Sequence, residues 1–130
     1  MNKILQPADW MKPKGYSNGI EATGRYVVIA GQIGWDGNGE FAGDDFLSQA
    51  AQALRNIVSI LREAGGRPEH LVRMTWYVLD KVEYCAAGKA LGNAYKEIIG
   101  THYPAMTLVV VAGLLEDRAR VEIEATAVIP

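Results

Sequence analysis

The sequence lacks the features that mark several common classes of protein. Its 130 residues include one cysteine, Cys85, which excludes an intrachain disulfide and favours a reducing compartment. No apolar run approaches the roughly 20 residues that a membrane-spanning helix requires. The segment up to Lys14 also lacks the apolar centre of a secretory signal. These absences predict a cytoplasmic protein with no membrane association.

Clustered positive charge and clustered metal ligands are missing as well. The 13 lysines and arginines never occur three in a row, and the formal net charge is −2. A surface that follows nucleic-acid phosphates needs concentrated basic residues, so no nucleic-acid partner is expected. His70 and His102 each stand without a second ligand at metal spacing, and no metal or other cofactor is predicted.

Two short patterns allow a chemical or a structural interpretation. Residues 36–40, Asp-Gly-Asn-Gly-Glu, resemble the start of a calcium loop, but Phe41 and Leu47 replace the glycine and glutamate that such a loop needs. A hairpin turn is the better interpretation, because Asp-Gly and Asn-Gly pairs supply the positive φ of tight turns. Cys85 lies near a helix start, where the dipole favours a thiolate, although a small side chain there is more often a filler.

Hydrophobic periodicity predicts a single α+β domain over residues 1–130. An apolar stripe with steps of three and four follows Asp44 or Asp45, either of which can cap the helix, and Gly65 ends it. A second helix is predicted from about Val82 to Ile99. The predicted strands cover residues 25–31, 71–79, 107–112 and 121–129, after an extended arm over residues 6–15. This order predicts a mainly antiparallel sheet with both helices on one face.

The opposite face of the sheet is expected to support self-association. Val28, Trp76 and Val110 are assigned to it, and together they make it too apolar for a face in contact with water. Glu122 and Glu124 leave their strand on one side. Inside an oligomer, burial would raise the pKa of one of these carboxylates toward values useful in acid–base catalysis, whereas on a solvated face both are ordinary. The sequence leaves these two possibilities open.

Five segments of the chain resemble the RidA/YjgF family. They are Gly15-Tyr-Ser-Asn-Gly19, Ala30-Gly-Gln-Ile33, Asn93-Ala-Tyr95, Tyr103-Pro-Ala105 and Val121-Glu-Ile-Glu-Ala-Thr-Ala127, of which the last two are the most specific. The resemblance implies a chorismate-mutase-like fold, related to the ferredoxin-like fold, and a homotrimer with clefts between subunits. It also implies a small-molecule ligand, because better-studied members hydrolyse reactive enamines and imines to keto acids and ammonia.

The same resemblance implies which residues line each cleft. Tyr16 and Glu122 are the implied catalytic residues, with Glu122 positioning or protonating a water. The implied substrate-binding residues are Gly31, Ile33, Asn93, Ala105, Met106 and Leu108.

Met106 is the main departure from the family pattern. An arginine directly after Pro-Ala binds the substrate carboxylate in imine-hydrolysing members, whereas the thioether of Met106 donates no hydrogen bond. Losing a bidentate, charge-assisted clamp lowers carboxylate affinity by on the order of a hundredfold or more. Ala30, Leu108 and Gly92 also replace more polar family residues, so the pocket is expected to be more apolar. Arg118 or Arg73 is the alternative source of a cation.

Three functions follow from these residues. The first is hydrolytic deamination of an imine or enamine that depends less on an α-carboxylate, such as an amino-muconate-type intermediate. The second is a non-catalytic or regulatory trimer that binds a small apolar or aromatic ligand or a partner protein. The third is a ribonuclease or translation inhibitor, which the net charge and the isolated histidines argue against.

Overall fold

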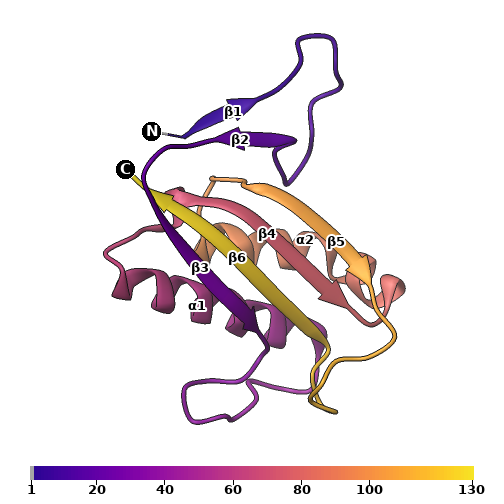
Figure 1. Cartoon of the computed structure of the whole chain (residues 1–130). Helices are drawn as coiled ribbons and strands as arrows, with labels where there is room; N and C mark the ends of the chain where they lie inside the picture. The colour runs from indigo at the N-terminus through magenta and orange to yellow at the C-terminus, as the bar shows by residue number, and fades with distance from the viewer. Residues whose placement is uncertain (1) are drawn as a thin grey trace.

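A computed structural model describes residues 2–130 as two helices packed on one face of a four-stranded sheet (Figure 1). The elements in chain order are β1 (Lys3–Leu5), β2 (Gly19–Glu21), β3 (Arg25–Gln32), α1 (Phe46–Glu63), a short 3-10 turn (Pro68–His70), β4 (Leu71–Val78), α2 (Lys81–Ile98), β5 (Ala105–Val110) and β6 (Val121–Ile129). The strands lie in the order β3-β6-β4-β5. Neighbours pair antiparallel except for β4 and β5, which run parallel.

Helix α1 follows the predicted amphipathic pattern. Asp45 is its N-cap and accepts a hydrogen bond from the Ser48 N–H over 2.9 Å. The helix ends before Gly65, which has a φ of 78° that residues with a side chain rarely adopt. Its apolar stripe, with Leu54 and Ile57 fully buried, packs on β3 and β6. The boundaries predicted from the sequence are confirmed at both ends.

Helix α2 covers the other half of the same sheet face. It begins at Lys81 after the N-cap Asp80, whose carboxylate accepts from the Val82 N–H over 2.8 Å. The backbone at Gly88 is non-helical (φ 15°, ψ −99°), so the helix is kinked there. Leu91 and Tyr95 are the buried residues of α2, so only a narrow strip of this helix is buried in the chain. The helix therefore leaves room between itself and the β5 edge.

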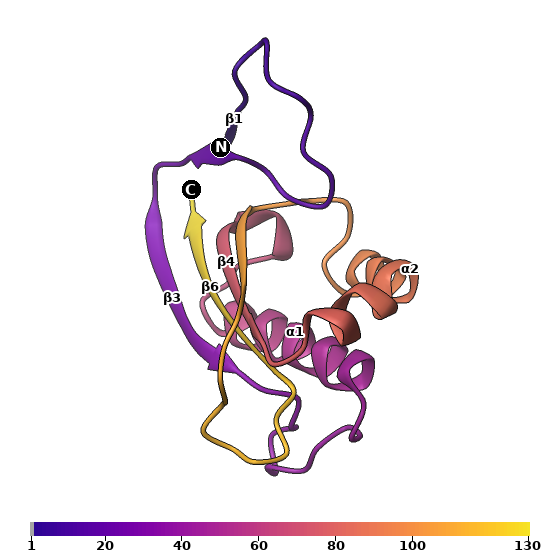
Figure 2. The same cartoon turned by 90° about the vertical axis from the view of Figure 1, so that its right-hand side faces the viewer.

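The sheet face opposite the helices carries different residues from those expected. Among residues 2–130, no helix or strand covers this face (Figure 2). Trp76 was assigned to it wrongly: it is 3% exposed and belongs to the core on the helix side. Val110 pairs with the buried Val78, so its placement was also wrong. Val28 does lie on the open face, 79% exposed, opposite Thr126.

The amino-terminal strand pair was not predicted. Strands β1 and β2 form a separate two-stranded sheet, seen beside the main sheet in Figure 1. The stretch between them, residues 6–18, is an irregular arm. Residues 6–15 were expected to be extended, but they contain a turn in which the Trp10 N–H donates to Pro7 O over 3.1 Å. In the described part of the chain, no helix is long and apolar enough to span a membrane.

Candidate functional site

The amino-terminal arm is fixed along the start of β5 by Ser17. The Ser17 N–H donates to Pro104 O over 3.0 Å, and its hydroxyl donates to Tyr103 O over 2.5 Å. Ser17 is 6% exposed and also pairs with Ala105 in a parallel bridge. Because the backbone of Ser17 is held in this way, the preceding Tyr16 lies beside the first residues of β5.

A groove forms where this arm meets β5 and α2. This β5 groove has a volume of about 290 Å³ and is lined by Lys14, Gly15, Tyr16, Tyr84, Met106 and Leu108. Three of the predicted site residues, Tyr16, Met106 and Leu108, are therefore brought together. Lys14 is the cationic residue of the groove and was not singled out from the sequence, because its approach depends on how the arm folds back.

Glu122 lies away from this groove, on the open face of the sheet. It pairs with Tyr77 of β4, and its neighbours Val121 and Ile123 point into the core. A hollow of about 450 Å³ surrounds it; we call this the sheet-face site. It is lined by Tyr77, Glu122, Glu124 and residues of the loop that follows β5 (Val111, Gly113, Leu114, Leu115).

Gly31 and Glu122 are in direct contact. A Cβ built on Gly31 would overlap the Glu122 carboxylate, with Oε2 as its nearest atom. Gly31 lies at the irregular end of β3, between Ile29 and Gln32, and its missing side chain leaves just enough space for this carboxylate beside the backbone. The predicted neighbourhood of Gly31 and Glu122 is thus present within a single chain.

A second carboxylate on the open face is engaged by a tyrosine. The Tyr77 hydroxyl donates a hydrogen bond to Glu124 Oε1. This bond is the main reason that the pKa of Tyr77 is raised above its ordinary value, with burial and the charge of Glu124 adding to it. Among the described residues, no side chain forms a hydrogen bond or ion pair with Glu122. Its carboxylate is therefore free to contact a ligand or another subunit.

The groove and the sheet-face site do not merge within one chain. Met106 pairs with Met74, which is fully buried on the helix side of the sheet. Glu122 projects from the opposite side, and its partner Tyr77 stands three residues farther along β4. A small molecule held against Met106 is therefore separated by the sheet from the Glu122 of the same chain.

The remaining predicted residues fall in different surroundings. Ile33 is buried (7% exposed) and its carbonyl accepts from the Asn56 side chain over 3.2 Å. Ala105 is half-buried at the start of β5. Asn93 is exposed on α2 and lines none of the described pockets, whereas the adjacent Gly92 does line one. The displacement of the family asparagine by one position thus removes an amide from the cavity.

Neither arginine suggested from the sequence lies in the β5 groove. Arg118 forms an ion pair with Asp44 (2.7 Å) and stacks on Phe41, 4.7 Å from the ring centre. Arg73 lines a hollow on the open face together with Glu124. Within one chain, these arginines do not replace the clamp that Met106 has lost.

The two histidines and residues 36–40 are accounted for by structural contacts. His102 Nε2 lies 2.6 Å from Leu71 O, and His70 Nδ1 accepts from the Arg67 N–H over 3.0 Å. Residues 36–40 form the expected turn, in which Asp36 accepts from two backbone N–H groups. Within residues 2–130, no three histidine, cysteine or acidic side chains come close enough to hold a metal ion.

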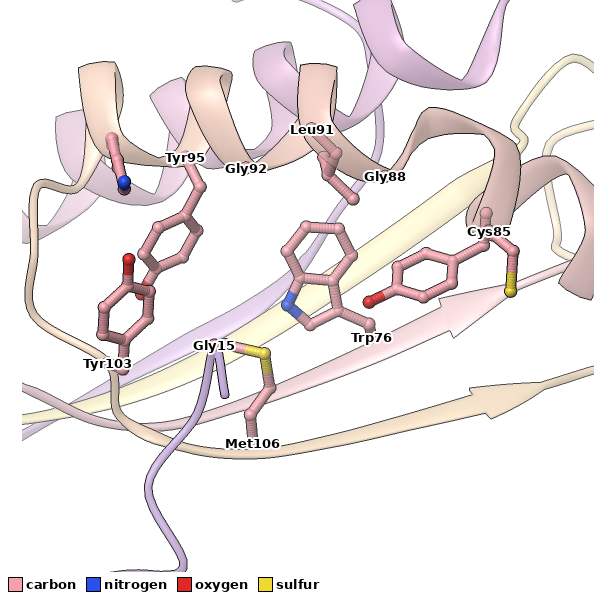
Figure 3. A pocket seen from close by; sticks show the side chains of 11 residues that line it. Gly15, Trp76, Cys85, Gly88, Leu91, Gly92, Tyr95, Tyr103 and Met106 are labelled. Atoms are coloured by element: carbon pink, nitrogen blue, oxygen red, sulfur yellow. The ribbon is translucent and has the colours of Figure 1, made fainter. Parts of the chain in front are cut away.

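A larger cavity adjoins the β5 groove and was missed by sequence analysis (Figure 3). This aromatic pocket, of about 400 Å³, lies between α2 and the β4–β5 edge. It is bordered by Trp76, Tyr84, Leu91, Tyr95, Tyr103 and Met106, among others. The sequence signal that could have revealed it is the pair Gly88 and Gly92 on one face of a helix, opposite a tryptophan in a strand.

The geometry describes a small α+β protein with a groove at one sheet edge and a carboxylate site on the open sheet face. The family model described as Endoribonuclease L-PSP matches residues 10–129. A RutC family protein of Pyrococcus horikoshii is 34% identical over 129 residues, which cover 98% of each chain. The chain therefore belongs to the RidA/YjgF family, to which the Endoribonuclease L-PSP model corresponds.

Solved structures and a relative with a named activity agree with this assignment. A Rid-family protein from Yersinia pestis, YyfB, has a TM-score of 0.84 at 33% identity, covering 98% of each chain. A YjgF-family member from Mycobacterium tuberculosis gives a TM-score of 0.67 at 32% identity, covering 88% of this chain and 87% of its own. These likenesses confirm the predicted fold class. A Salmonella typhimurium protein named 2-iminobutanoate/2-iminopropanoate deaminase is 32% identical and covers 87% of this chain and 86% of its own.

Proposed function

We propose that this protein hydrolyses an imine or enamine to a carbonyl compound and ammonia, in clefts between the subunits of a homotrimer. Each cleft would combine the β5 groove of one subunit with the sheet-face site of its neighbour. The observation that carries the proposal is the separation of Met106 and Glu122 on opposite sides of one sheet. Both belong to the cleft that the family resemblance implies, Glu122 as a catalytic residue and Met106 as a substrate-binding residue, and only a second subunit can bring them to one ligand.

The proposed chemistry needs one proton donor and acceptor and one water. Hydrolysis of a C=N bond adds water to the carbon and releases the nitrogen as ammonia. Glu122, held beside the Gly31 backbone, would pass a proton between the attacking water and the leaving nitrogen. Tyr16, 41% exposed in the groove, would donate a hydrogen bond to the substrate.

Substrate choice would differ from that of the deaminase-named relatives. Met106 offers no bidentate partner for a carboxylate, and Lys14 supplies a mobile point charge in place of a planar fork. A substrate that relies on an α-carboxylate would therefore bind on the order of a hundredfold more weakly than in a protein with arginine at this position. We assign the chain to a subgroup without this arginine.

The first test is a deamination assay on the wild type and on Met106→Arg and Glu122→Gln. An amino acid oxidase generates 2-imino acids in place, and keto acid release is timed against a control without the protein. We expect little acceleration by the wild type and a clear gain for Met106→Arg. That gain should disappear in the double variant with Glu122→Gln. An inactive Met106→Arg protein, or a fully active Glu122→Gln protein, contradicts the proposal.

A non-catalytic binding protein is the second candidate. The apolar character of Met106 and Leu108 in the groove favours it, because these side chains retain a ligand without assisting a reaction. The Glu122→Gln variant separates the two candidates. It abolishes turnover by an enzyme but leaves ligand affinity in a simple binder unchanged. The ribonuclease suggested by the name of the family model has no support in the charge of the chain, which is −2.

A further inference from the structure

The aromatic pocket continues directly from the β5 groove. Gly15, Tyr84 and Met106 line both hollows, so a ligand in the groove has a route beneath helix α2. The pocket volume of about 400 Å³ falls within the range of roughly 300–1,000 Å³ that is typical of small-molecule sites. Figure 3 shows its side chains converging on one space between the helix and the sheet.

Flat aromatic surfaces make up much of the pocket wall. Tyr95 and Tyr103 stack with ring centres 5.3 Å apart and planes within 8° of parallel. The Tyr95 hydroxyl donates to His102 O over 2.7 Å, so this ring is held in place. Rings with fixed orientation favour a planar ligand, which can stack on a face or meet an edge. Lys96 is the charged residue that lines the pocket.

Trp76 brings an unused hydrogen-bond donor to this wall. The residue is 3% exposed, and its indole Nε1 is a buried polar atom without a partner in the described chain. In Figure 3 the indole nitrogen is directed toward the side of the pocket formed by Met106 and Gly15. A buried N–H with no acceptor is unfavourable in a folded protein, and buried indole N–H groups usually find a partner. The position therefore suits an acceptor atom supplied by a ligand.

Two glycines keep the helix side of the pocket open. A Cβ added at Gly88 or Gly92 meets no atom within 4 Å. Gly88 lies at the kink of α2, Gly92 follows it in the helix, and both line the cavity. Neither residue places a side chain in the space beneath the helix, and larger side chains there would narrow it.

We propose that the aromatic pocket binds a planar aromatic ring whose ring nitrogen or carbonyl oxygen accepts a hydrogen bond from Trp76 Nε1. This inference rests on the proposed function in one respect, because it takes the aromatic molecule bound in the pocket to be the substrate. Its ring would occupy the aromatic pocket while its C=N group lies in the β5 groove. Trp76 then determines specificity, and ring recognition takes over part of the binding that an arginine at position 106 would otherwise supply.

Quinoline and naphthalene form a matched pair of probes for this pocket. They have nearly the same shape, and at pH 7.5 quinoline presents a neutral acceptor nitrogen that naphthalene lacks. The full-length protein labelled with ¹⁵N gives indole N–H signals, and the Trp76 signal is identified by its loss in Trp76→Phe. We expect quinoline to shift this signal downfield as a hydrogen bond forms, and Trp76→Phe to weaken quinoline binding about tenfold more than naphthalene binding. An unmoved Trp76 signal, or equal losses for both probes, overturns the proposal.

A second pair of variants decides the matter if Trp76→Phe does not fold. Gly92→Leu adds a large side chain where a Cβ meets no atom within 4 Å, and Gly92→Ala is its small control. Gly92→Leu should abolish saturable binding of both probes, while Gly92→Ala should retain binding within about twofold of the wild type. Unchanged binding to a folded Gly92→Leu protein overturns the location of the site.

The outcome of these experiments is separate from the outcome of the deamination assay. Probe binding at Trp76 in a protein that hydrolyses no imine, even as Met106→Arg, supports the pocket and contradicts the proposed enzyme. Deamination of aliphatic imines without any saturable probe binding supports the enzyme and overturns the aromatic pocket as a ligand site.

Discussion

At the scale of single residues, two glycines close together in the sequence, Gly31 and Gly34, have different structural roles. Gly31 faces the end of the flexible Glu122 side chain, whereas a Cβ at Gly34 would overlap the Cα and Cβ of Gln49. Gln49 is fully buried and bonds to Gly43 O, Arg118 O and the Arg120 N–H. The first glycine therefore controls the position of a carboxylate, and the second controls packing of the fold.

This difference predicts that alanine at Gly31 affects catalysis, whereas alanine at Gly34 affects stability. Gly31→Ala should displace the Glu122 carboxylate and lower kcat of the Met106→Arg protein by roughly a hundredfold, since misplacement of a catalytic group by about 1 Å has effects of that size. Its unfolding midpoint in urea should change little. Gly34→Ala should lower the midpoint clearly. Equal loss of stability in both variants would show that Gly31 is a packing residue only.

The N-cap of α1 gives a prediction with a defined pH dependence. Hydrogen bonds from the Ser48 N–H and hydroxyl lower the pKa of Asp45 below its ordinary value of 3.8. The charged form is thus favoured by folding, and its contribution is present above pH 3.8 and is lost as the pH falls through the lowered pKa. Asp45→Ala should reduce the free energy of unfolding by about 1 kcal/mol at pH 7, and by less at pH 3.

Asp44→Ala is the control for this measurement. Asp44 contacts Arg118 in an exposed ion pair, which contributes little to stability. Urea unfolding of both variants and the wild type between pH 3 and pH 7 tests the assignment. A larger effect for Asp44 than for Asp45, or a cost that grows at low pH, would contradict it.

At the scale of elements, segments with a clear hydrophobic period could be predicted from the sequence, whereas the direction in which the side chains of β4 point could not. The steps of three and four in α1 and the alternation over residues 121–127 of β6 each define one buried face, so their boundaries and orientation could be predicted. Trp76 was assigned to the wrong sheet face because β-branched and aromatic residues occur on both sides of β4. Its orientation is set by the buried Met74 and Val78.

The site was predicted in part for a related reason. Tyr16, Met106 and Glu122 each lie within or directly beside a short family motif, so they could be named as candidates from the family pattern. The two hollows and the aromatic pocket could not, because they depend on how the arm, α2 and β5 are placed relative to one another. The strand pair β1–β2 has three residues in each strand, too few for a periodic signal.

The attachment of the arm to β5 predicts a local change in dynamics. Ser17→Ala removes the bond from the buried hydroxyl to Tyr103 O and should reduce the free energy of unfolding by about 1 kcal/mol. Hydrogen exchange should become faster in residues 14–19, with the rest of the sheet unaffected. Asn18→Ala is the matched control, because Asn18 bonds to the exposed Gln6 side chain within the arm. Unchanged exchange in Ser17→Ala would contradict the proposed anchoring.

At the scale of the whole molecule, one chain provides two incomplete sites. The β5 groove holds Tyr16 and Met106, and the open sheet face holds Glu122 with an exposed Val28. Apolar residues exposed on a sheet face favour self-association, and a closed ring of identical contacts would place a groove against a carboxylate at each interface. The proposed trimer and the proposed activity therefore depend on each other.

Mixing two inactive variants tests this central claim most directly. In the Met106→Arg protein, Glu122→Gln removes the carboxylate, and in a second chain Leu108→Trp fills the groove; each should be inactive as a pure oligomer of unchanged size. Co-refolded in equal amounts, they should regain about a quarter of the parent deaminase rate, because random assortment leaves that share of interfaces with two intact halves. Mixed oligomers that stay inactive would contradict a site shared between subunits.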